Sequence, residues 1–223
     1  MTQTRILLSI GRIPISSTIV TTWGVMAVLT LLALVLCRRI EEPQGVYLLP
    51  EVFVEYITAL TEGMIGETAK GYVPFIATIA LFVGAANLSG VLPGVTPPTQ
   101  DLATPAALGT CAFAVAHFTS VRTKGFSRFA REFFEPYWWL LPLNLISILS
   151  RPLSHIFRLY GNMVGGAILT SVAIMLAPWL VPVPVMAWFS VFIGLIQAFV
   201  FTILSVAYIA ESQDDRRNTQ VAN

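Results

Sequence analysis

The apolar tract from Tyr137 to Ala177 constrains the fold of this chain more than any other feature. Arg158 lies near its middle, and no Asp or Glu occurs between Pro136 and Ala210. As a helix the tract would be about 60 Å long, twice the roughly 30 Å hydrocarbon core of a bilayer. We therefore expect a helix that tilts steeply in a membrane, breaks or folds back.

Arg158 is costly at such a depth. An arginine at the bilayer centre costs about 2.5–3.5 kcal/mol on insertion scales, and a guanidinium group cannot lose its proton to avoid that cost. Because the surrounding apolar tracts hold no acid, the counter-charge is expected from another chain. This requirement favours an ion-handling machine over a structural scaffold.

Composition supports a polytopic membrane protein. Hydrophobic residues make up 56% and charged residues 11% of 223 residues, which is far from the values of soluble domains. The net charge of +1 gives no attraction to nucleic acid. Cys37 and Cys111 fall in separate apolar runs without metal-like spacing, so we expect free thiols, no metal site and no cofactor. The amino terminus lacks the pattern of a cleaved signal peptide, and the first apolar run is expected to remain as a span.

Five apolar runs predict five spanning segments in one all-α membrane domain over residues 1–223. They are Ile15–Leu36, Val73–Leu92, Leu102–Val121, Tyr137–Ala177 and Val183–Ala210.

The basic residues orient these spans, because cytoplasmic loops carry an excess of Lys and Arg. With the amino terminus outside, one side collects Arg38, Arg39, Lys70, Arg122, Lys124, Arg128, Arg131, Arg216 and Arg217. Five spans then place the carboxyl terminus in the cytoplasm. Residues 212–223 are predicted to form a polar, disordered cytoplasmic tail.

The segment Pro50–Lys70 has the pattern of an amphipathic surface helix. Apolar residues recur at helical spacing on one face, namely Phe53, Ile57, Leu60 and Met64, and Glu51, Glu55 and Glu62 lie opposite. Anionic lipids would repel this acidic face, so it is expected to meet water or a partner protein.

Polar residues form a stripe along the long tract. Spacings of three and four place on one helical face Asn144, Ser147, Arg151, His155, Arg158 and Asn162. The last span carries a second small or polar face of Ser190, Gly194, Gln197 and Ser205. Two such faces without a carboxylate would suit an aqueous half-channel beside a partner that carries acids.

Several of these residues also have structural interpretations. Gln197 alone would more often be an interhelical hydrogen-bonding group. One interpretation of Arg151 is a structural residue at a hydrated entrance, and His155 is either a satisfied histidine or part of a water path. Pro152 is expected to bend the tract. Gly161, Gly165 and Gly166 would let another backbone approach closely.

Several segments resemble subunit a of F-type ATP synthases. They are Ser-Arg-Pro-Leu-Ser (150–154), Arg-Leu-Tyr-Gly-Asn-Met (158–163), Gln197–Ile209, Asn87–Gly94 and Pro98–Thr104. The resemblance covers residues 73–211, and the order of one span, a surface helix, a hairpin and two long helices also agrees. It implies that the last two helices lie tilted against a ring of c subunits.

The resemblance further implies roles and partners. Arg158 would be the essential stator arginine and Gln197 its neighbour on the last helix, and Asn162 and Asp101 fall where the family places polar residues around its half-channels. The polar pattern, rather than the resemblance, adds His155, Ser190, Arg151 and Ser147 as supporting residues. The chain would lie in the inner membrane of a prokaryote. The chain would be a non-catalytic stator subunit that couples proton or sodium translocation to ATP synthesis or hydrolysis. Its partners would be c subunits with membrane carboxylates, b-type peripheral stalk subunits and the lipid bilayer.

The chain departs from the family pattern at three positions. Ala167 stands nine residues after Arg158, where the family usually has an acid or histidine, and Ser190 and Ser147 replace further polar or acidic partners. A branch with sodium-type c subunits is one interpretation. A self-contained secondary transporter or channel is the alternative function, although such proteins usually carry their own coupling acid or an inverted repeat.

Asp101 precedes the third span and has two interpretations. An acid at the predicted outer surface could attract cations to a channel mouth. Asp is also a preferred residue for capping the helix that is expected to start at Leu102.

Overall fold

The computed structural model describes residues 6–10, 13–37, 48–92, 94–132, 134, 137–177 and 181–221. It confirms the predicted polytopic all-α architecture. Four helices of the described residues are long and apolar enough to cross a membrane, namely Ser17–Leu36, Val73–Val91, Trp138–Leu176 and Pro182–Gln213. The sequence pattern did not predict the short antiparallel hairpin of β1 (Ile6–Ile10) and β2 (Ile13–Ser16). Arg38 and Arg39, at the predicted end of the first span, lie outside the described residues.

The helices follow one another in the predicted order. They are α1 (Ser17–Cys37), α2 (Leu48–Ile65), α3 (Val73–Leu88), α4 (Ala103–Lys124), α5 (Phe126–Glu132), α6 (Leu141–Leu176), α7 (Pro182–Met186) and α8 (Gly194–Val221). Short 3₁₀ segments lie at η2 (Glu67–Gly71), η3 (Ser89–Val91), η4 (Pro98–Gln100) and η5 (Trp138–Leu140), and η6 (Ala187–Ile193) is a π-helix.

The predicted third span is the helix α4. Its 22 residues would extend about 33 Å, enough to cross a bilayer. It is not among the four candidate spans, because it carries threonines, a histidine, Arg122 and Lys124. Its crossing of the membrane therefore stays a prediction.

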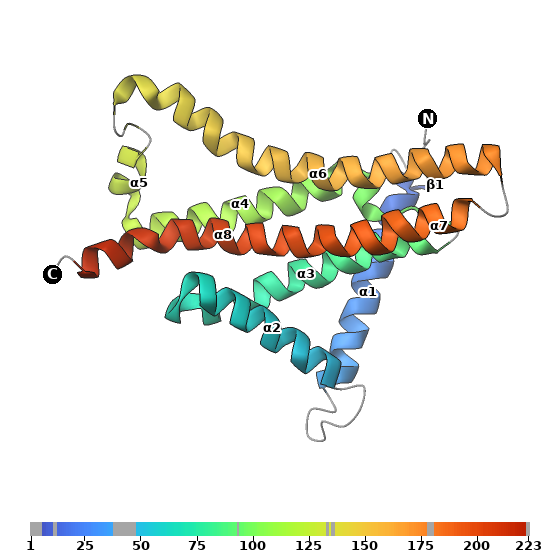
Figure 1. Cartoon of the computed structure of the whole chain (residues 1–223), viewed down its shortest axis with the longest axis horizontal. Helices are drawn as coiled ribbons and strands as arrows, with labels where there is room; N and C mark the ends of the chain where they lie inside the picture. The colour runs from blue at the N-terminus through green and yellow to red at the C-terminus, as the bar shows by residue number, and fades with distance from the viewer. Residues whose placement is uncertain are drawn as a thin grey trace.

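The long tract forms the single unbroken helix α6. Its 36 residues extend about 54 Å. Of the three expected arrangements, a break and a fold back therefore do not occur within this helix. Pro152 lies inside it and is buried. Figure 1 shows the yellow amino-terminal part of α6 inclined to the remainder. A proline interior to a helix removes one backbone hydrogen bond and produces such a bend.

The carboxyl-terminal helix differs from the prediction. α7, η6 and α8 follow one another without a break, and α8 continues to Val221. Residues 212–221, where a disordered tail is expected, therefore belong to this helix in the structure. Figure 1 shows α6 and α8 running antiparallel along the long axis of the molecule, with α1 crossing at a steep angle.

The helix α2 is amphipathic as predicted, and its apolar face is covered by this chain. Ile57 and Ile65 are buried in a cluster with Ile76 of α3 and with Val206 and Ile209 of α8. Phe53 and Met64 pack against the same cluster. The acidic residues on the other face are exposed, as expected, namely Glu51, Glu55 and Glu62.

A second cluster holds α3, α6 and α8 together. It contains Ile79, Val83, Leu159, Ala198 and Phe201, and three of these side chains are fully buried. Helices in lipid gain little from hydrophobic association, so such close packing is what fixes their arrangement. This cluster lies directly beside the polar residues of α6 and α8 and thereby positions them.

Candidate ion-handling site

Most of the polar stripe of α6 lines one open cavity beside α8. The cavity has a volume of about 520 Å³ and is lined by Ser147, Ser150, Arg151, Ser154, His155, Arg158, Leu204 and Tyr208. Four of the predicted residues therefore meet there: Ser147, Arg151, His155 and Arg158. Among the residues that the structure describes, the lining holds two arginines and no carboxylate. The cavity is polar because serines and charged groups share one side of α6.

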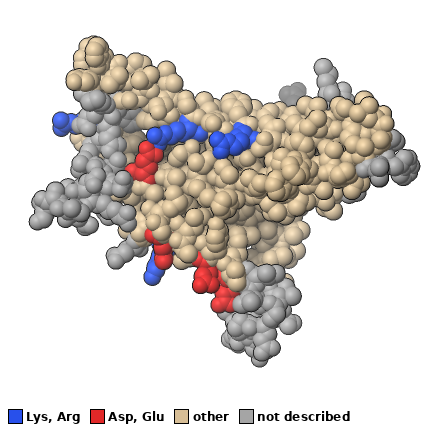
Figure 2. Space-filling view, in the orientation of Figure 1, with Lys and Arg blue, Asp and Glu red and all other residues tan. Residues whose placement is uncertain are grey.

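Arg158 is the charged group at mid-helix. Its side chain is exposed, and it forms no hydrogen bond or ion pair with any residue of the described part of the chain. This agrees with the expectation that its counter-charge comes from elsewhere. Figure 2 shows basic side chains on this face of α6, on a surface that is otherwise largely uncharged.

Asn162 and Gln197 join α6 to α8. The Asn162 Nδ2 group donates a hydrogen bond of 3.0 Å to Gln197 Oε1. Gln197 is only 3% exposed, and its Nε2 atom is buried with no partner among the described residues. The interhelical interpretation of Gln197 is thus correct for its oxygen, while its amide nitrogen remains available to donate. Asn162, the partner of Gln197, lies one helical turn beyond Arg158 in α6.

His155 lies under the cavity. It is 3% exposed, and its ring centroid lies 3.9 Å from that of Phe201. Its Nε2 atom is buried without a hydrogen-bond partner in the described residues. Buried polar atoms are normally hydrogen-bonded, so His155 lacks the bonds of a satisfied core histidine among the described residues. Its place in a water path stays a prediction.

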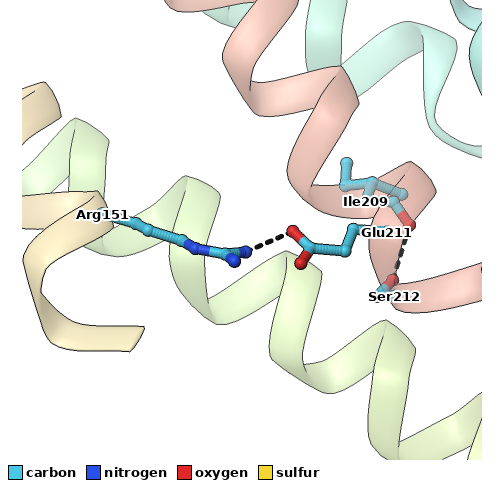
Figure 3. A network of polar contacts seen from close by, with 4 residues as sticks. All are labelled: Arg151, Ile209, Glu211 and Ser212. Carbon is cyan, nitrogen blue, oxygen red and sulfur yellow. Dashed lines mark hydrogen bonds and ion pairs between the residues drawn. The ribbon is translucent and has the colours of Figure 1, made fainter. Parts of the chain in front are cut away.

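Arg151 is paired with an acid that lies just beyond the last apolar run. Its guanidinium Nη1 donates to Glu211 Oε2 of α8, and the two side chains point toward each other across the gap between the helices (Figure 3). The side chains are 46% and 58% exposed, respectively. Such an exposed pair contributes about 0–1 kcal/mol. Glu211 was not predicted as a site residue, although its position seven residues after Leu204 places it on the cavity side of α8.

A second polar contact, not predicted, lies at the other end of α8. Asn87 of α3 is fully buried and donates from Nδ2 to the Gly194 carbonyl oxygen at 3.0 Å. Thr99 donates to Asn87 Oδ1 at 2.9 Å. A polar residue in the apolar helix α3 was the available signal. Gly194 follows the π-helix η6, and such irregular turns are frequent at functional sites.

Ser190 and Ser205 lie away from the cavity. Ser190 is 8% exposed, and a Cβ atom added at Gly90 would lie 2.8 Å from its hydroxyl oxygen. Ser205 is 1% exposed and bonds the Phe201 carbonyl of its own helix. Of the predicted second polar face, Gln197 alone reaches the polar residues of α6 through a hydrogen bond in the described part.

Asp101 is bonded to the backbone at the start of α4. Its Oδ1 atom accepts the Ala103 N–H at 3.2 Å, and its Oδ2 atom accepts from the Thr18 hydroxyl at 3.1 Å. The helix begins at Ala103 rather than at Leu102. Asp101 lies one residue before the N-cap position, Leu102, and satisfies one of the free N–H groups at the helix start, which is a variant of the expected capping role. Its role in attracting cations stays a prediction.

The glycines of α6 do not all serve the same contact. A Cβ atom added at Gly166 would lie 2.8 Å from Phe189 Cβ, so the close approach expected there is to η6. Gly161 and Gly165 have open space at the same position. Among the residues that the structure describes, the expected close approach of a backbone does not occur at these two glycines.

The fold and the site define a polytopic helical membrane protein in which an arginine beside a polar cavity has no ion-pair partner among the described residues. Among the described residues, no group of three His, Cys, Asp or Glu side chains could hold a metal ion. The sequence profile of the ATP synthase A chain family matches residues 19–210. The chain belongs to this family.

Curated relatives agree with this assignment over nearly the whole chain. The chain is 38% identical over 202 residues to ATP synthase subunit a of Moorella thermoacetica. The matched region covers 90% of this chain and 92% of the relative. It is 38% identical over 205 residues to ATP synthase subunit a 2 of a Bradyrhizobium species, with 92% of each chain covered. It is 39% identical over 199 residues to ATP synthase subunit a of Geobacter sulfurreducens, with 87% and 86% covered. Four apolar helices agree with a component of a membrane sector.

Proposed function

We propose that this chain is the stator subunit of a rotary ATP synthase or ATPase and forms ion half-channels against a ring of c subunits. The single observation that carries the proposal is Arg158, an exposed cation in the middle of a long membrane helix with no partner in the described chain. A charge in that position is expensive without an opposite charge. A carboxylate on a neighbouring membrane subunit is the simplest group that could supply it.

The coupling follows from electrostatics. A c-subunit carboxylate that faces lipid must carry its ion, because an unpaired charge there is prohibitively costly. Near Arg158 the ionised carboxylate is favoured, because an opposite charge lowers the pKa of an acid. The ion therefore leaves into one half-channel, and a new ion binds from the other. The fixed positive charge also prevents a direct leak of cations between them.

Two polar regions on opposite sides of Arg158 suit the two half-channels. One is the cavity that extends along α6 from Arg158 to Ser147, about 16 Å along the helix axis. The other runs from the bond between Asn162 and Gln197 toward the polar contact of Asn87 with Gly194. By the distribution of Lys and Arg, the cavity opens to the cytoplasm and the second region to the outside.

The surface beside Arg158 is suited to an apolar partner. Side chains around it are large, exposed and apolar, namely Leu149, Leu153 and Phe157 of α6 and Leu195, Ile196 and Phe199 of α8. A ring of c subunits and the lipid bilayer would cover them. The exposed acidic face of α2 is the surface we assign to water or a b-type stalk subunit.

Purification of the tagged chain in mild detergent tests this proposal. A stator subunit is expected to co-purify with a small proteolipid ring and to give ATP-driven cation uptake only when reconstituted with the whole complex. The alternative, a self-contained transporter or channel, predicts a chain that transports ions alone in liposomes. Sodium dependence of ATP hydrolysis by the complex distinguishes a sodium path from a proton path.

A further inference from the structure

Glu211 stands at the end of the cavity that is remote from Arg158. Leu204 and Tyr208 line the cavity from α8, and Glu211 follows at the next helical position on the same face. The turn that carries it is well fixed, because Ile209 is fully buried and the Ser212 hydroxyl bonds the Ile209 carbonyl at 2.6 Å (Figure 3). Its carboxylate is therefore held beside Arg151.

The cavity without Glu211 would repel cations. Arg151 and Arg158 both line it, and the described lining contains no acid. Two positive charges in one polar cavity raise the electrostatic potential there and disfavour the entry of cations. Glu211 supplies, from the neighbouring helix, the negative charge that the residues of α6 lack.

We propose that Glu211 determines the cation selectivity of this mouth. Its carboxylate neutralises Arg151 and exchanges this arginine for the incoming cation. This inference rests on the proposed function, in which the cavity is the cytoplasmic half-channel. The exposure of both side chains keeps the pair hydrated, so its two partners separate easily. A cation that arrives at the mouth can then meet the carboxylate while Arg151 turns to water.

A purely structural role for the pair is the competing explanation. α8 is already held to α2, α3 and α4 by Val206, Ile209 and the cluster around them. Thr68 also donates to Gln213 Oε1 at 2.6 Å. An exposed ion pair adds little to such an anchored helix, and the charge of Glu211 is the property that these contacts do not provide.

The test uses inverted membrane vesicles that carry the complete complex, with the cytoplasmic face outward. ATP-driven uptake of protons and of sodium is measured at low and high concentrations of each cation. Glu211→Gln leaves Arg151 unpaired and is expected to lower the initial rate at low cation concentration by roughly tenfold, the scale of charge effects on association at a channel mouth. High cation concentration is expected to restore most of the rate.

Removing the other partner distinguishes the two explanations. Arg151→Gln leaves a free carboxylate at the mouth and is expected to raise the rate at low cation concentration. The double variant Arg151→Gln/Glu211→Gln is expected to recover most of the loss caused by Glu211→Gln. Equal losses in both single variants at all concentrations, or failure of both to assemble, would show a structural tie and overturn the inference.

Two controls complete the experiment. Glu62→Gln removes an exposed acid of α2, away from the cavity, and is expected to pump as the unaltered complex does. Arg158→Ala separates the two proposals. If its vesicles still pump, the proposed function fails. If they do not, and Glu211→Gln pumps normally at low cation concentration, the inference about Glu211 alone is wrong.

Discussion

Asn162 donates a hydrogen bond to Gln197 across the contact between α6 and α8, one helical turn from Arg158. The bond fixes the Gln197 oxygen, while the Gln197 Nε2 atom is buried without a partner in the described chain. A buried donor without a partner is costly. An unbonded donor one helical turn from Arg158 suits a group that donates to a carboxylate or to water during ion exchange.

Asn162→Ala is expected to weaken both packing and transport. It leaves the buried Gln197 oxygen unpaired, and hydrogen bonds between membrane helices contribute about 0.6 kcal/mol on average and up to about 1.7 kcal/mol. We expect a loss of about 1 kcal/mol, measured as a lower temperature of thermal dissociation of the purified complex, together with slower ATP-driven pumping. Ser171→Ala is the matched control, because its exposed hydroxyl bonds the Ala167 carbonyl of its own helix. A similar effect of both variants would contradict the assignment.

A disulfide is expected to form between cysteines at positions 166 and 189. A Cβ atom added at Gly166 lies 2.8 Å from Phe189 Cβ, so little movement brings the pair to the 3.5–4.5 Å that disulfides require. In a chain whose Cys37 and Cys111 are replaced by serine, oxidation should shift the mobility of the Gly166→Cys/Phe189→Cys variant on a non-reducing gel. The Gly165→Cys/Phe189→Cys variant is the control, because a Cβ atom added at Gly165 meets nothing. Equal crosslinking by the two pairs would contradict the packing of η6 on α6.

Gly194→Ala is expected to separate α3 from α8. The new methyl group would lie 2.9 Å from Asn87 Cβ and would displace the side chain that bonds the Gly194 carbonyl. Such overpacking costs about 1–3 kcal/mol, and we expect a correspondingly lower thermal stability and yield of the complex. Gly84→Ala is the matched substitution, because its added carbon would make an ordinary 3.8 Å contact with Ala198. Equal stability of the two variants would argue against the tight contact.

Substitutions of Asp101 separate its two roles. Asp101→Asn keeps an oxygen for the Ala103 N–H and is expected to preserve stability, whereas Asp101→Ala should cost about 1 kcal/mol. If Asp101 also attracts cations, Asp101→Asn should pump more slowly at low cation concentration and recover at high concentration, with normal subunit levels. Normal pumping by Asp101→Asn at every concentration would leave only the capping role.

The sequence predicted the parts of this structure that depend on local pattern. Apolar runs of sufficient length gave α1, α3, α6 and α8, and the spacing of polar residues placed Ser147, Arg151, His155 and Arg158 around one cavity. Contacts between distant segments were not predictable in this way. The pairing of Arg151 with Glu211 depends on how α6 and α8 are aligned, and that alignment is set by packing at residues such as Phe201 and Leu159.

The continuation of α8 was missed for a different reason. The residues after Glu211 are polar, and polarity alone predicts disorder. A helix that is already nucleated and anchored by buried Val206 and Ile209 extends at little cost into such a segment. The π-helix η6 was not predicted from the sequence either. Phe189 and Ser190 of this segment contact distant segments at Gly166 and Gly90, and such contacts do not follow from local pattern.

Pumping by complexes altered at Arg158 tests the central claim most directly. Arg158→Ala and Arg158→Lys should both assemble with the ring and retain ATP hydrolysis, and both should lose ATP-driven cation uptake in inverted vesicles. Lysine is expected to fail because an ammonium group is more strongly hydrated and places its charge differently from a planar guanidinium. Uptake at the unaltered rate by assembled complexes of either variant would contradict the account.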